Sequence, residues 1–369
     1  MIDKDSTQMY HEQLHAILLD QIRDGRLAPG QKVPSERVLS EMYGVSRTTA
    51  KTAVLRLLKE GLVVRATGKG TFVSSEAGSD HLRARRTGNI GFVLNKRREH
   101  RVPLVEDAVY LSLSQSIQTE VADRGLHVMV AMVDEHDVSE VNSFKSLVEK
   151  VDGLIIAEPR NQDLADLARA RRRPVVLATP SEHHPPMDSV DIDNEQAGFE
   201  ATRYLLDEGH RRIAYVKGPE SIVATELRLE GYRRALAAAG VNAEASLVVG
   251  GEGWKVEHGH EAFAALERGP RRFTAVVCAN DLLAIGVLRA AKAAGRAVPY
   301  DLSVIGCDNI ELSAHCDPPL TTMESHIRAI GRVATRRLLE RIAGDDSPEQ
   351  RVLLPATVVE RGSCAGPAR

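Results

Sequence analysis

The 369-residue sequence is poor in cysteine, with four residues irregularly spaced in its last quarter. This spacing provides neither a disulfide framework nor a paired metal site, and it suits a reducing compartment. No apolar run approaches the roughly 18 residues that a membrane-spanning helix needs. The polar, acidic start Met1–Ser6 is not followed by the apolar core of a secretory signal. We therefore expect a soluble, cytoplasmic protein without a bound metal.

Motifs of catalysis are also lacking. The Gly-rich segment Gly250–Gly253 is not followed by the Lys-Ser/Thr pair of a phosphate-binding loop. The chain contains no GxSxG sequence and no Cys/His arrangement that indicates a nucleophile. These absences predict a protein that is not an enzyme, has no catalytic residues and carries no cofactor.

A strong overall charge is missing as well, because the formal net charge is −3. The near-neutral total conceals an asymmetry: residues 1–88 carry +4 and the remaining 281 residues carry −7. Residues 45–72 include six basic residues and only one acidic residue, Glu60. A basic block attached to an acidic body suggests a head that binds a polyanion and a body that does not.

Residues 1–74 show the pattern of a small domain with three helices and a hairpin. Apolar residues recur at helical spacing over Tyr10–Asp24, over Glu36–Tyr43 and after Ser46. Two β-prone runs then flank a Gly-rich tip that ends at Gly70, which predicts a β-hairpin. Residues 75–88 are small, polar and charged, and we interpret them as a linker.

Residues 89–369 alternate between apolar runs and amphipathic helical stretches. This order is typical of right-handed βαβ units with mostly parallel sheets. There are too many strands for one sheet, so we expect two doubly wound α/β lobes with a cleft between them. The predicted strands are Ile90–Leu94, His127–Val133, Gly153–Ala157, Pro174–Ala178, Ile213–Val216, Ala275–Cys278 and Leu302–Ile305.

The strongest functional signal is a helix-turn-helix followed by a hairpin. Its second helix begins after Ser46, and it places Arg47 and Lys51 one turn apart on the face opposite the apolar stripe. Basic and hydroxyl residues at such a helix start contact phosphates and base edges. Lys69, at the hairpin tip, could reach the neighbouring backbone or minor groove. A solvated charged face is the alternative interpretation of this helix by itself.

The same segment resembles the winged helix of GntR-family transcription regulators. The resemblance is carried by the runs PGQKVPSER (29–37), GVSRTTAK (44–51), Gly61-Leu62 and GKGTFV (68–73). Lys51 departs from the family, which usually has Arg there and so a bidentate fork. The resemblance implies DNA contacts at Arg37, Ser46, Arg47, Thr49, Lys51, Thr67 and Gly68.

Residues 89–362 resemble a second family, the sugar-responsive effector domains of LacI/GalR regulators, which are similar to periplasmic sugar-binding proteins. The matching stretches are 190–194, 209–214, 228–232, 278–281 and 304–309. Cys307 departs from the aromatic residue usual before Asp308. The resemblance implies two lobes joined by three crossovers, near 190, 325 and 355. A GntR-type head on a LacI-type body resembles the AraR subgroup.

Three polar residues of the body point to a ligand site by their position alone. Arg228, Asn280 and Asp308 follow strands or begin helices, where α/β sheets bind ligands. Their mixture of donors and acceptors suits a sugar or polyol, and Trp254, the only Trp, could stack on a sugar's apolar face. The alternatives are an ion pair between the lobes for Arg228 and Asp308, and plain surface packing for Trp254.

Together these features predict a ligand-responsive transcriptional repressor that binds operator DNA as a homodimer and is released by a sugar-like effector. The subgroup suggests arabinose or a related pentose, with a nucleoside or hexose as alternatives. One rival is an aminotransferase-like enzyme with a GntR head and pyridoxal phosphate, although such bodies are longer. The other is a transport binding protein, which the basic head argues against.

Overall fold

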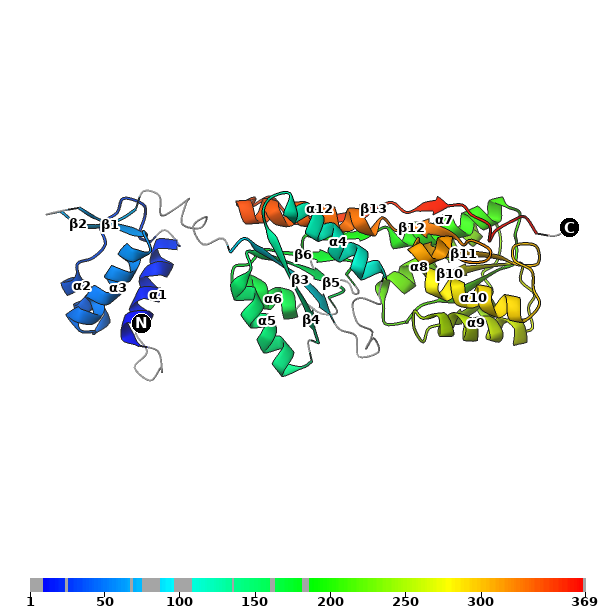
Figure 1. The fold of residues 1–369 in the computed structure, drawn as a ribbon, viewed down its shortest axis with the longest axis horizontal. Coiled ribbons are helices and arrows are strands. Elements are labelled where there is room, and N and C mark those ends of the chain that lie inside the picture. The colour runs from blue at the N-terminus through cyan, green and yellow to red at the C-terminus, as the bar shows by residue number, and fades with distance from the viewer. Residues whose placement is uncertain are drawn as a thin grey trace. The chain divides into compact units, whose positions relative to one another are not determined.

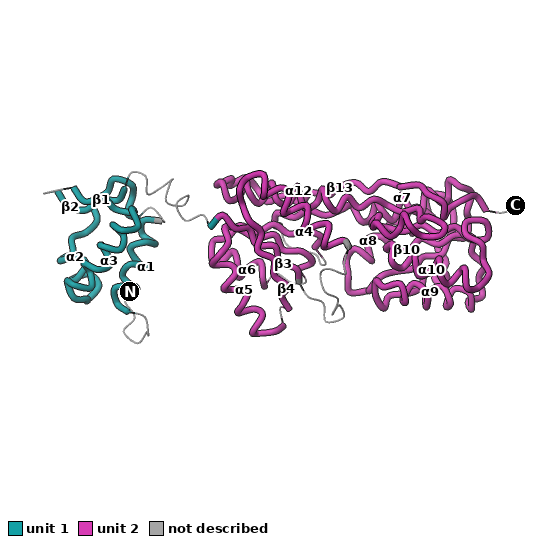
Figure 2. Tube along the Cα trace, in the orientation of Figure 1, with its two compact units in different colours: residues 1–87 teal, residues 88–369 magenta. Residues whose placement is uncertain are grey.

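The computed structural model describes residues 9–23, 26–66, 69–74, 87–95, 108–134, 136–159, 163–180 and 186–367. Contacts divide the chain into two compact units, Met1–Thr87 and Gly88–Arg369, which we call the head and the body (Figure 2). Of the predicted linker, residues 75–86 lie outside the described residues. None of the helices in these ranges is long and apolar enough to cross a membrane.

The head contains three helices and a hairpin, as the sequence predicts (Figure 1). The helices are α1 (Tyr10–Arg23), α2 (Glu36–Tyr43) and α3 (Arg47–Lys59), and the antiparallel strands are β1 (Val63–Ala66) and β2 (Gly70–Val73). The apolar stripes of the three helices meet in one buried core that also includes residues of both strands. Burial of this core holds the outer face of α3 in place.

Local interactions determine where α2 begins and how the chain turns from α2 into α3. The Ser35 hydroxyl accepts a hydrogen bond from the Val38 N–H at 3.4 Å, and the Ser46 hydroxyl accepts one from the Thr49 N–H at 3.0 Å. These are N-caps, which satisfy backbone donors that a helix start leaves open. Gly44 ends α2 with φ 65°, a left-handed conformation that glycine adopts without penalty.

The body consists of two parallel-sheet α/β lobes, which confirms the expected fold class. Lobe 1 contains β3 (Asn89–Asn95), β4 (His127–Val133), β5 (Gly153–Ala157), β6 (Val175–Ala178), β7 (Ser189–Ile192) and β13 (Arg351–Leu354), with α4 (Ala108–Ala122), α5 (Val138–Lys150), α6 (Asp163–Ala170) and α12 (Ile327–Ala343). Its strand order is β13-β7-β6-β5-β3-β4, and all neighbours are parallel.

Lobe 2 repeats this design. It contains β8 (Ile213–Lys217), β9 (Val248–Gly250), β10 (Ala275–Cys278), β11 (Ser303–Asp308), β12 (Thr321–Glu324) and β14 (Thr357–Val359), with α7 (Asn194–Asp207), α8 (Val223–Ala238), α9 (Val256–Arg268), α10 (Asp281–Ala293) and the short α11 (Glu311–Ala314). The strand order is β14-β12-β11-β10-β8-β9, and β14 pairs antiparallel with β12. Helices cover both faces of each sheet, α4 and α12 opposite α5 and α6 in lobe 1, and α7 and α8 opposite α9 and α10 in lobe 2.

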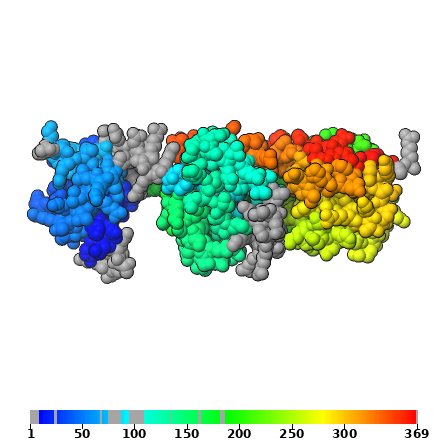
Figure 3. All heavy atoms as spheres, in the orientation of Figure 1, coloured from blue at the N-terminus to red at the C-terminus, as the bar shows by residue number. Residues whose placement is uncertain are grey.

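The chain passes between the lobes three times, near the positions that the family resemblance implied. The crossovers join β7 to α7, β12 to α12, and β13 to β14. As a result α12, late in the sequence and orange in Figure 3, lies beside the cyan and green residues of lobe 1. Each lobe is therefore built from segments that are far apart along the chain.

Paired glycines let α7 and α8 cross at backbone contact. A Cβ on Gly198 of α7 would lie 2.0 Å from the Arg228 carbonyl oxygen, and a Cβ on Gly231 of α8 would lie 2.0 Å from the Glu195 carbonyl oxygen. Real Cβ atoms do not approach backbone this closely, so only glycine fits at either position. The crossing sets the place of the Arg228 side chain relative to the start of α7.

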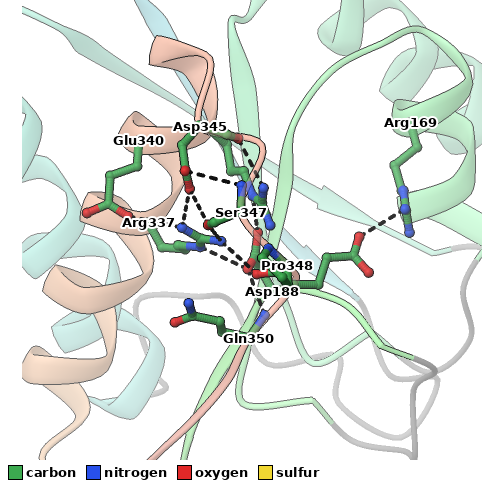
Figure 4. Close-up of polar contacts among 10 residues, drawn as sticks. Arg169, Asp188, Arg337, Glu340, Asp345, Ser347, Pro348 and Gln350 are labelled. Atoms are coloured by element: carbon green, nitrogen blue, oxygen red, sulfur yellow. Dashed lines mark hydrogen bonds and ion pairs between the residues drawn. The ribbon is translucent and has the colours of Figure 1, made fainter.

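A buried carboxylate holds three parts of lobe 1 together (Figure 4). Asp188, just before β7, accepts hydrogen bonds from Arg337 Nε at 2.9 Å, from Arg341 Nε at 2.6 Å and from the Gln350 N–H at 3.0 Å. Arg337 also donates to Asp345 at 2.5 Å. The cluster ties the end of α12 and the segment before β13 to the start of β7, so that lobe 1 is braced as one body.

We expect Asp188→Asn to lower the free energy of unfolding by about 3 kcal/mol at neutral pH, because two arginines lose a buried anionic partner. Although burial works to raise the pKa of Asp188, hydrogen bonds from Arg341 and Arg337 outweigh it and hold that pKa below its ordinary value. A depressed carboxylate pKa stabilises the fold above the ordinary pKa, and this stabilisation is lost as the pH falls through the folded-state pKa.

Urea unfolding curves measured across pH give the free energy of unfolding of Asp188→Asn and of the unchanged chain. The difference between these two free energies should become smaller only in strong acid. The control is Asp207→Asn, which removes an exposed carboxylate paired with Arg203 at 2.8 Å and should change stability by less than about 1 kcal/mol. Equal effects of the two substitutions would show that the buried cluster does not brace lobe 1.

Candidate functional site

The outer face of α3 presents the basic residues that the sequence predicts to bind DNA. Arg47 and Lys51 are exposed one helical turn apart, and within the described part of the chain neither forms an ion pair or side-chain hydrogen bond. Lys69, exposed immediately before β2, is likewise without a side-chain partner there. Three cations that are not neutralised internally remain available for phosphates or base edges.

The other predicted DNA-contacting residues differ in their surroundings. Arg37 is exposed and pairs with Glu41 at 3.2 Å across one turn of α2. The Ser46 and Thr49 hydroxyls lie 2.8 Å apart at the start of α3, where the Ser46 hydroxyl caps the helix. Thr67 and Gly68 lie outside the described residues.

The body contains a cavity of about 430 Å³ between its two lobes. Its wall combines polar groups with an apolar surface contributed by both lobes. The volume and the mixed lining are those of a site for a small organic molecule. The larger apolar side chains of the lining are Val109, Tyr110, Ile222, Trp254, Val256, Leu282, Ile310, Ile327 and Ile330.

All four predicted effector-contacting residues, Arg228, Trp254, Asn280 and Asp308, line this cavity. Arg228 lies on α8, Asn280 caps α10 and Asp308 ends β11. Three separate elements of lobe 2 therefore position these three side chains. They meet because the carboxyl ends of parallel strands, and the helix starts that follow, lie at one edge of the sheet.

Arg228 is buried and is held by a set of acceptors. It donates from Nε to Asn194 Oδ1 at 2.9 Å and from Nη1 to the Ala279 carbonyl oxygen, and its Nη2 lies 3.5 Å from Asp308 Oδ1. The alternative interpretation of Arg228 and Asp308 as an ion pair between the lobes is wrong. Both belong to lobe 2, because α8 and β11 pack in the same lobe, and they pair within it.

Asn280 and Trp254 support each other at the wall of the cavity. Asn280 Oδ1 accepts the Leu283 N–H at 2.8 Å, and its Nδ2 donates to the Trp254 carbonyl oxygen at 3.3 Å. The Trp254 ring packs on Gly218, where an added Cβ would lie 2.3 Å from a ring carbon. Trp254 thus packs against the protein on one side and still contributes to the cavity lining.

One carboxylate, Asp191 of lobe 1, and the amide of Asn194 connect lobe 1 to this cluster. Asp191 on β7 accepts from the Ile192 N–H at 2.8 Å and from Asn194 Nδ2 at 3.1 Å. Burial raises the pKa of Asp191 to about 7, while the Ile192 N–H and the Arg228 charge oppose that rise. Burial therefore favours the protonated form of this carboxyl group more than water does, while both of its oxygens accept hydrogen bonds from the protein.

Sequence reasoning did not select Asp191, Asn194, Glu158 or Thr179, all of which line the cavity. A signal for them existed. Glu158 directly follows the apolar strand β5 and Thr179 directly follows β6, so both stand at the carboxyl end of a strand, as Asp308 does at the end of β11. In the described part of the chain, no cluster of three or more His, Cys, Asp or Glu side chains has the arrangement of a metal site.

Two protein families match separate parts of the chain. Residues 11–73 match the bacterial regulatory proteins of the gntR family. Residues 202–364 match the periplasmic binding protein-like domain. The first match covers the helices and hairpin of the head, and the second covers most of lobe 2 together with α12.

Similar proteins are transcriptional regulators. The HTH-type transcriptional repressor CytR of Escherichia coli K12 is 33% identical over 275 residues, which are 73% of this chain and 80% of the repressor. A solved complex of the transcriptional regulator CelR with cellobiose has a TM-score of 0.68 at 26% identity and covers 90% of this chain and 100% of that one. The lac repressor dimer bound to operator and the anti-inducer ONPF has a TM-score of 0.66 at 26% identity, covering 78% and 97%.

Proposed function

The chain belongs to the LacI/GalR-type bacterial transcriptional regulators, with a DNA-binding domain of the GntR family, and from this premise we propose that it is a homodimeric repressor released from operator DNA by a sugar-like effector. The observation that carries the proposal is the cavity between the lobes, where Arg228, Asn280 and Asp308 converge in a body joined to a DNA-binding head. The effector would bind there, and the operator would bind the head.

The chemistry of the cavity supports a sugar. Asp308 accepts hydroxyl hydrogens, Arg228 donates through a planar fork, and Asn280 offers both functions. The Trp254 ring offers an apolar face of the kind on which sugar C–H groups stack. The solved CelR complex contains cellobiose, which agrees with this class of ligand without identifying the ligand of this chain.

The head supports operator binding. The start of α3, with Arg47 and Lys51, would lie in the major groove, and Lys69 would contact the backbone beside it. Arg37, Ser46, Thr49, Thr67 and Gly68 complete the proposed contact set. Because the protein would act on chromosomal DNA, we place it in the cytoplasm.

A dimer follows from the size of the reading surface. One helix and one hairpin read a single half-site, and a near-palindromic operator matches a twofold protein. The lac repressor, which this body resembles, was solved as a dimer on its operator. The body, with its 282 residues Gly88–Arg369, offers more surface for the dimer contact than the small head.

The rival function, a pyridoxal-phosphate enzyme behind a GntR head, is less well supported. The proteins that match the body are transcriptional regulators, and the body matches a binding-protein fold. We therefore favour a regulator whose cavity binds its ligand without transforming it.

We expect operator affinity to fall by about 10³–10⁵ between roughly 50 and 200 mM salt, because two heads would contact on the order of 6–10 phosphates. Arg47→Ala should weaken binding to operator by about tenfold or more and change binding to unrelated DNA little, since base-edge contacts carry specificity. Lys69→Ala should weaken binding to both DNAs similarly, since phosphate contacts are independent of sequence. Fluorescence anisotropy titrations on both DNAs measure these effects.

The control is Arg203→Ala, which removes an exposed arginine of the body and should leave all DNA affinities unchanged. Operators with two half-sites should bind far more tightly than those with one. A flat salt response, or equal loss of affinity on both DNAs for Arg47→Ala, would contradict the assignment of α3 as the reading helix.

A further inference from the structure

The crossover from β12 to α12 begins beside Asp308, the cavity residue at the end of β11. Strand β12 is the parallel neighbour of β11, and it pairs Glu324 with Asp308. The chain then enters lobe 1 through Ser325 and His326, after which α12 begins at Ile327. Asp308, Ser325 and Ile327 all line the cavity. This crossover therefore starts at the wall of the candidate effector site.

The backbone around this crossover has left-handed conformations at residues other than glycine. Asp308 has φ 116°, Asn309 has φ 54° and His326 has φ 50°. Such conformations are uncommon outside glycine and persist only where the surrounding structure holds them. The Ser325 hydroxyl donates to the Asp308 carbonyl oxygen at 3.2 Å. The His326 N–H donates to Glu324 Oε1 at 2.8 Å. Side chains of the crossover thus hold two of these three residues.

Asn309 connects the end of β11 to Glu324. Its Nδ2 donates to Glu324 Oε2 at 2.7 Å, while the other carboxylate oxygen accepts the His326 N–H. Its Oδ1 accepts a hydrogen bond from Arg361 Nη2 at 2.5 Å. Hydrogen bonds therefore run from Arg361 through Asn309 and Glu324 to the His326 N–H. We call these four groups the crossover network.

Arg361 connects the crossover network to a second crossing of the chain between the lobes. It follows β14, the strand that the chain enters after leaving β13 in lobe 1, and β14 pairs antiparallel with β12. Its Nη1 donates to the Leu320 carbonyl oxygen at 2.7 Å and to Ser313 Oγ at 3.2 Å. Arg361 thereby fixes the residues after β11 and the residue before β12 to the end of β14.

The two central side chains of the crossover network lie outside the cavity. Asn309 and Glu324 are half-buried and are not among the described residues that line it. A ligand in the cavity would contact Asp308 and Ser325, but it would not reach these two side chains. The crossover network should therefore affect what a bound ligand does to the crossover more than it affects how tightly the ligand binds.

We propose that Asn309 and Glu324 are positioning residues that link the cavity to the crossover into lobe 1, and so determine how strongly the effector changes operator affinity. This inference rests on the proposed function, because it takes the cavity as the effector site and operator binding as the output. A ligand that moves Asp308 also moves the adjoining Asn309, and the hydrogen bonds carry this movement to His326. Rotation of one lobe against the other requires backbone changes at only a few such residues.

The pattern of donors and acceptors allows a test by exchange. Glu324→Gln leaves one acceptor where the crossover network needs two. Asn309→Asp removes the donor and places two carboxylates against each other. Each single substitution should therefore break the crossover network. In the double variant Asn309→Asp/Glu324→Gln, the new amide donates to the new carboxylate and its oxygen accepts the His326 N–H, so both hydrogen bonds return.

The first measurement is the ratio of operator affinities without and with a saturating ligand, in the full-length chain. The probes are arabinose, ribose, glucose, cellobiose and adenosine, and calorimetry gives the Kd of each. Each single variant should lower the ratio by about fivefold, within the usual range of coupling between sites, and change the Kd of the probe by less than about threefold. The double variant should restore the ratio. Glu220→Gln, which removes an exposed carboxylate on lobe 2, is the matched control and should change neither quantity.

The second measurement needs no ligand. Hydrogen exchange of the backbone amides in residues 320–330 reports how firmly the crossover is held. Each single variant should speed this exchange by about tenfold, as expected for the loss of one hydrogen bond to a charged group. The double variant should return the exchange rate to that of the unchanged chain.

A probe that releases the operator from both single variants as it does from the unchanged chain would overturn the proposal. Losses in the single variants that the double variant does not reverse would also overturn it. If none of the probes binds, hydrogen exchange decides alone, and unchanged rates in both single variants refute the proposal. A failure of the proposed function differs from these outcomes, because it would appear as an absence of operator binding by the unchanged chain.

Discussion

A chain carrying Asp308→Asn is expected to bind operator as the unchanged chain does and to lose its response to the effector. Asp308 is a charged acceptor at the end of β11, facing Arg228 at 3.5 Å. Replacing one carboxylate oxygen by an amide donor removes a charge-assisted hydrogen bond to the ligand, worth about 1.5–3 kcal/mol. Effector affinity should therefore fall by about 10–100-fold.

The response depends on this affinity because an effector shifts a regulator only through its different affinities for the two states. A coupling of about 5–150-fold in operator affinity is typical. At an effector concentration that releases the unchanged chain, Asp308→Asn should stay on the operator. The measurement is operator binding with and without a sugar that isothermal titration calorimetry shows to bind the unchanged full-length chain.

Arg228 offers a second, independent test of the same site. Arg228→Ala should also abolish the response, and Arg228→Lys should fail to restore it, because lysine keeps the charge but lacks the fork that contacts Asn194 and Ala279. Asp207→Asn serves as control for loss of a carboxylate on lobe 2. Normal responses in both Asp308→Asn and Arg228→Ala would place the effector site elsewhere in the body.

The second large effect is expected from Gly198→Ala, which should lower the free energy of unfolding by about 3 kcal/mol. The added Cβ would lie 2.0 Å from the Arg228 carbonyl oxygen. Because the obstructing atom is backbone, no side chain can rotate away, and α7 and α8 must separate. Helix propensity alone predicts the opposite change, because alanine stabilises a helix by about 1 kcal/mol relative to glycine. Urea unfolding therefore distinguishes a steric clash from an effect of propensity alone.

Ala237→Gly is the control for propensity, since Ala237 is exposed on α8 and its replacement should cost about 1 kcal/mol. The same contact recurs on the other face of lobe 2, where a Cβ on Gly286 of α10 would lie 2.1 Å from the Val256 carbonyl oxygen. Gly286→Ala should therefore behave like Gly198→Ala. Stabilisation by either substitution would contradict the close crossing of these helices.

The head was predictable to the level of its individual elements, because its determinants are local. Ser35 and Ser46 cap the helices, Gly44 ends α2, and the apolar stripes repeat at helical spacing. Each signal acts within a few residues, so it can be recognised without knowledge of the rest of the chain. The exposure of Arg47 and Lys51 followed from the same periodicity.

The sequence by itself determined the fold class of the body and part of its cavity. Alternating strands and helices specify parallel sheets, and a polar residue at the carboxyl end of a strand, such as Asp308, lies where such sheets bind ligands. This rule applies equally to Glu158 and Thr179, which were overlooked because no family motif marked them.

The tertiary structure alone decided which of these positions share one cavity. Residues 158, 179, 191, 228, 280 and 308 come from six different segments, and three crossovers determine which lobe each segment joins. It also decided that Arg228 pairs with Asp308 inside lobe 2, and that the Thr179 hydroxyl is buried with no hydrogen-bond partner among the described residues. Such facts depend on packing between distant segments, and local sequence carries no record of that packing.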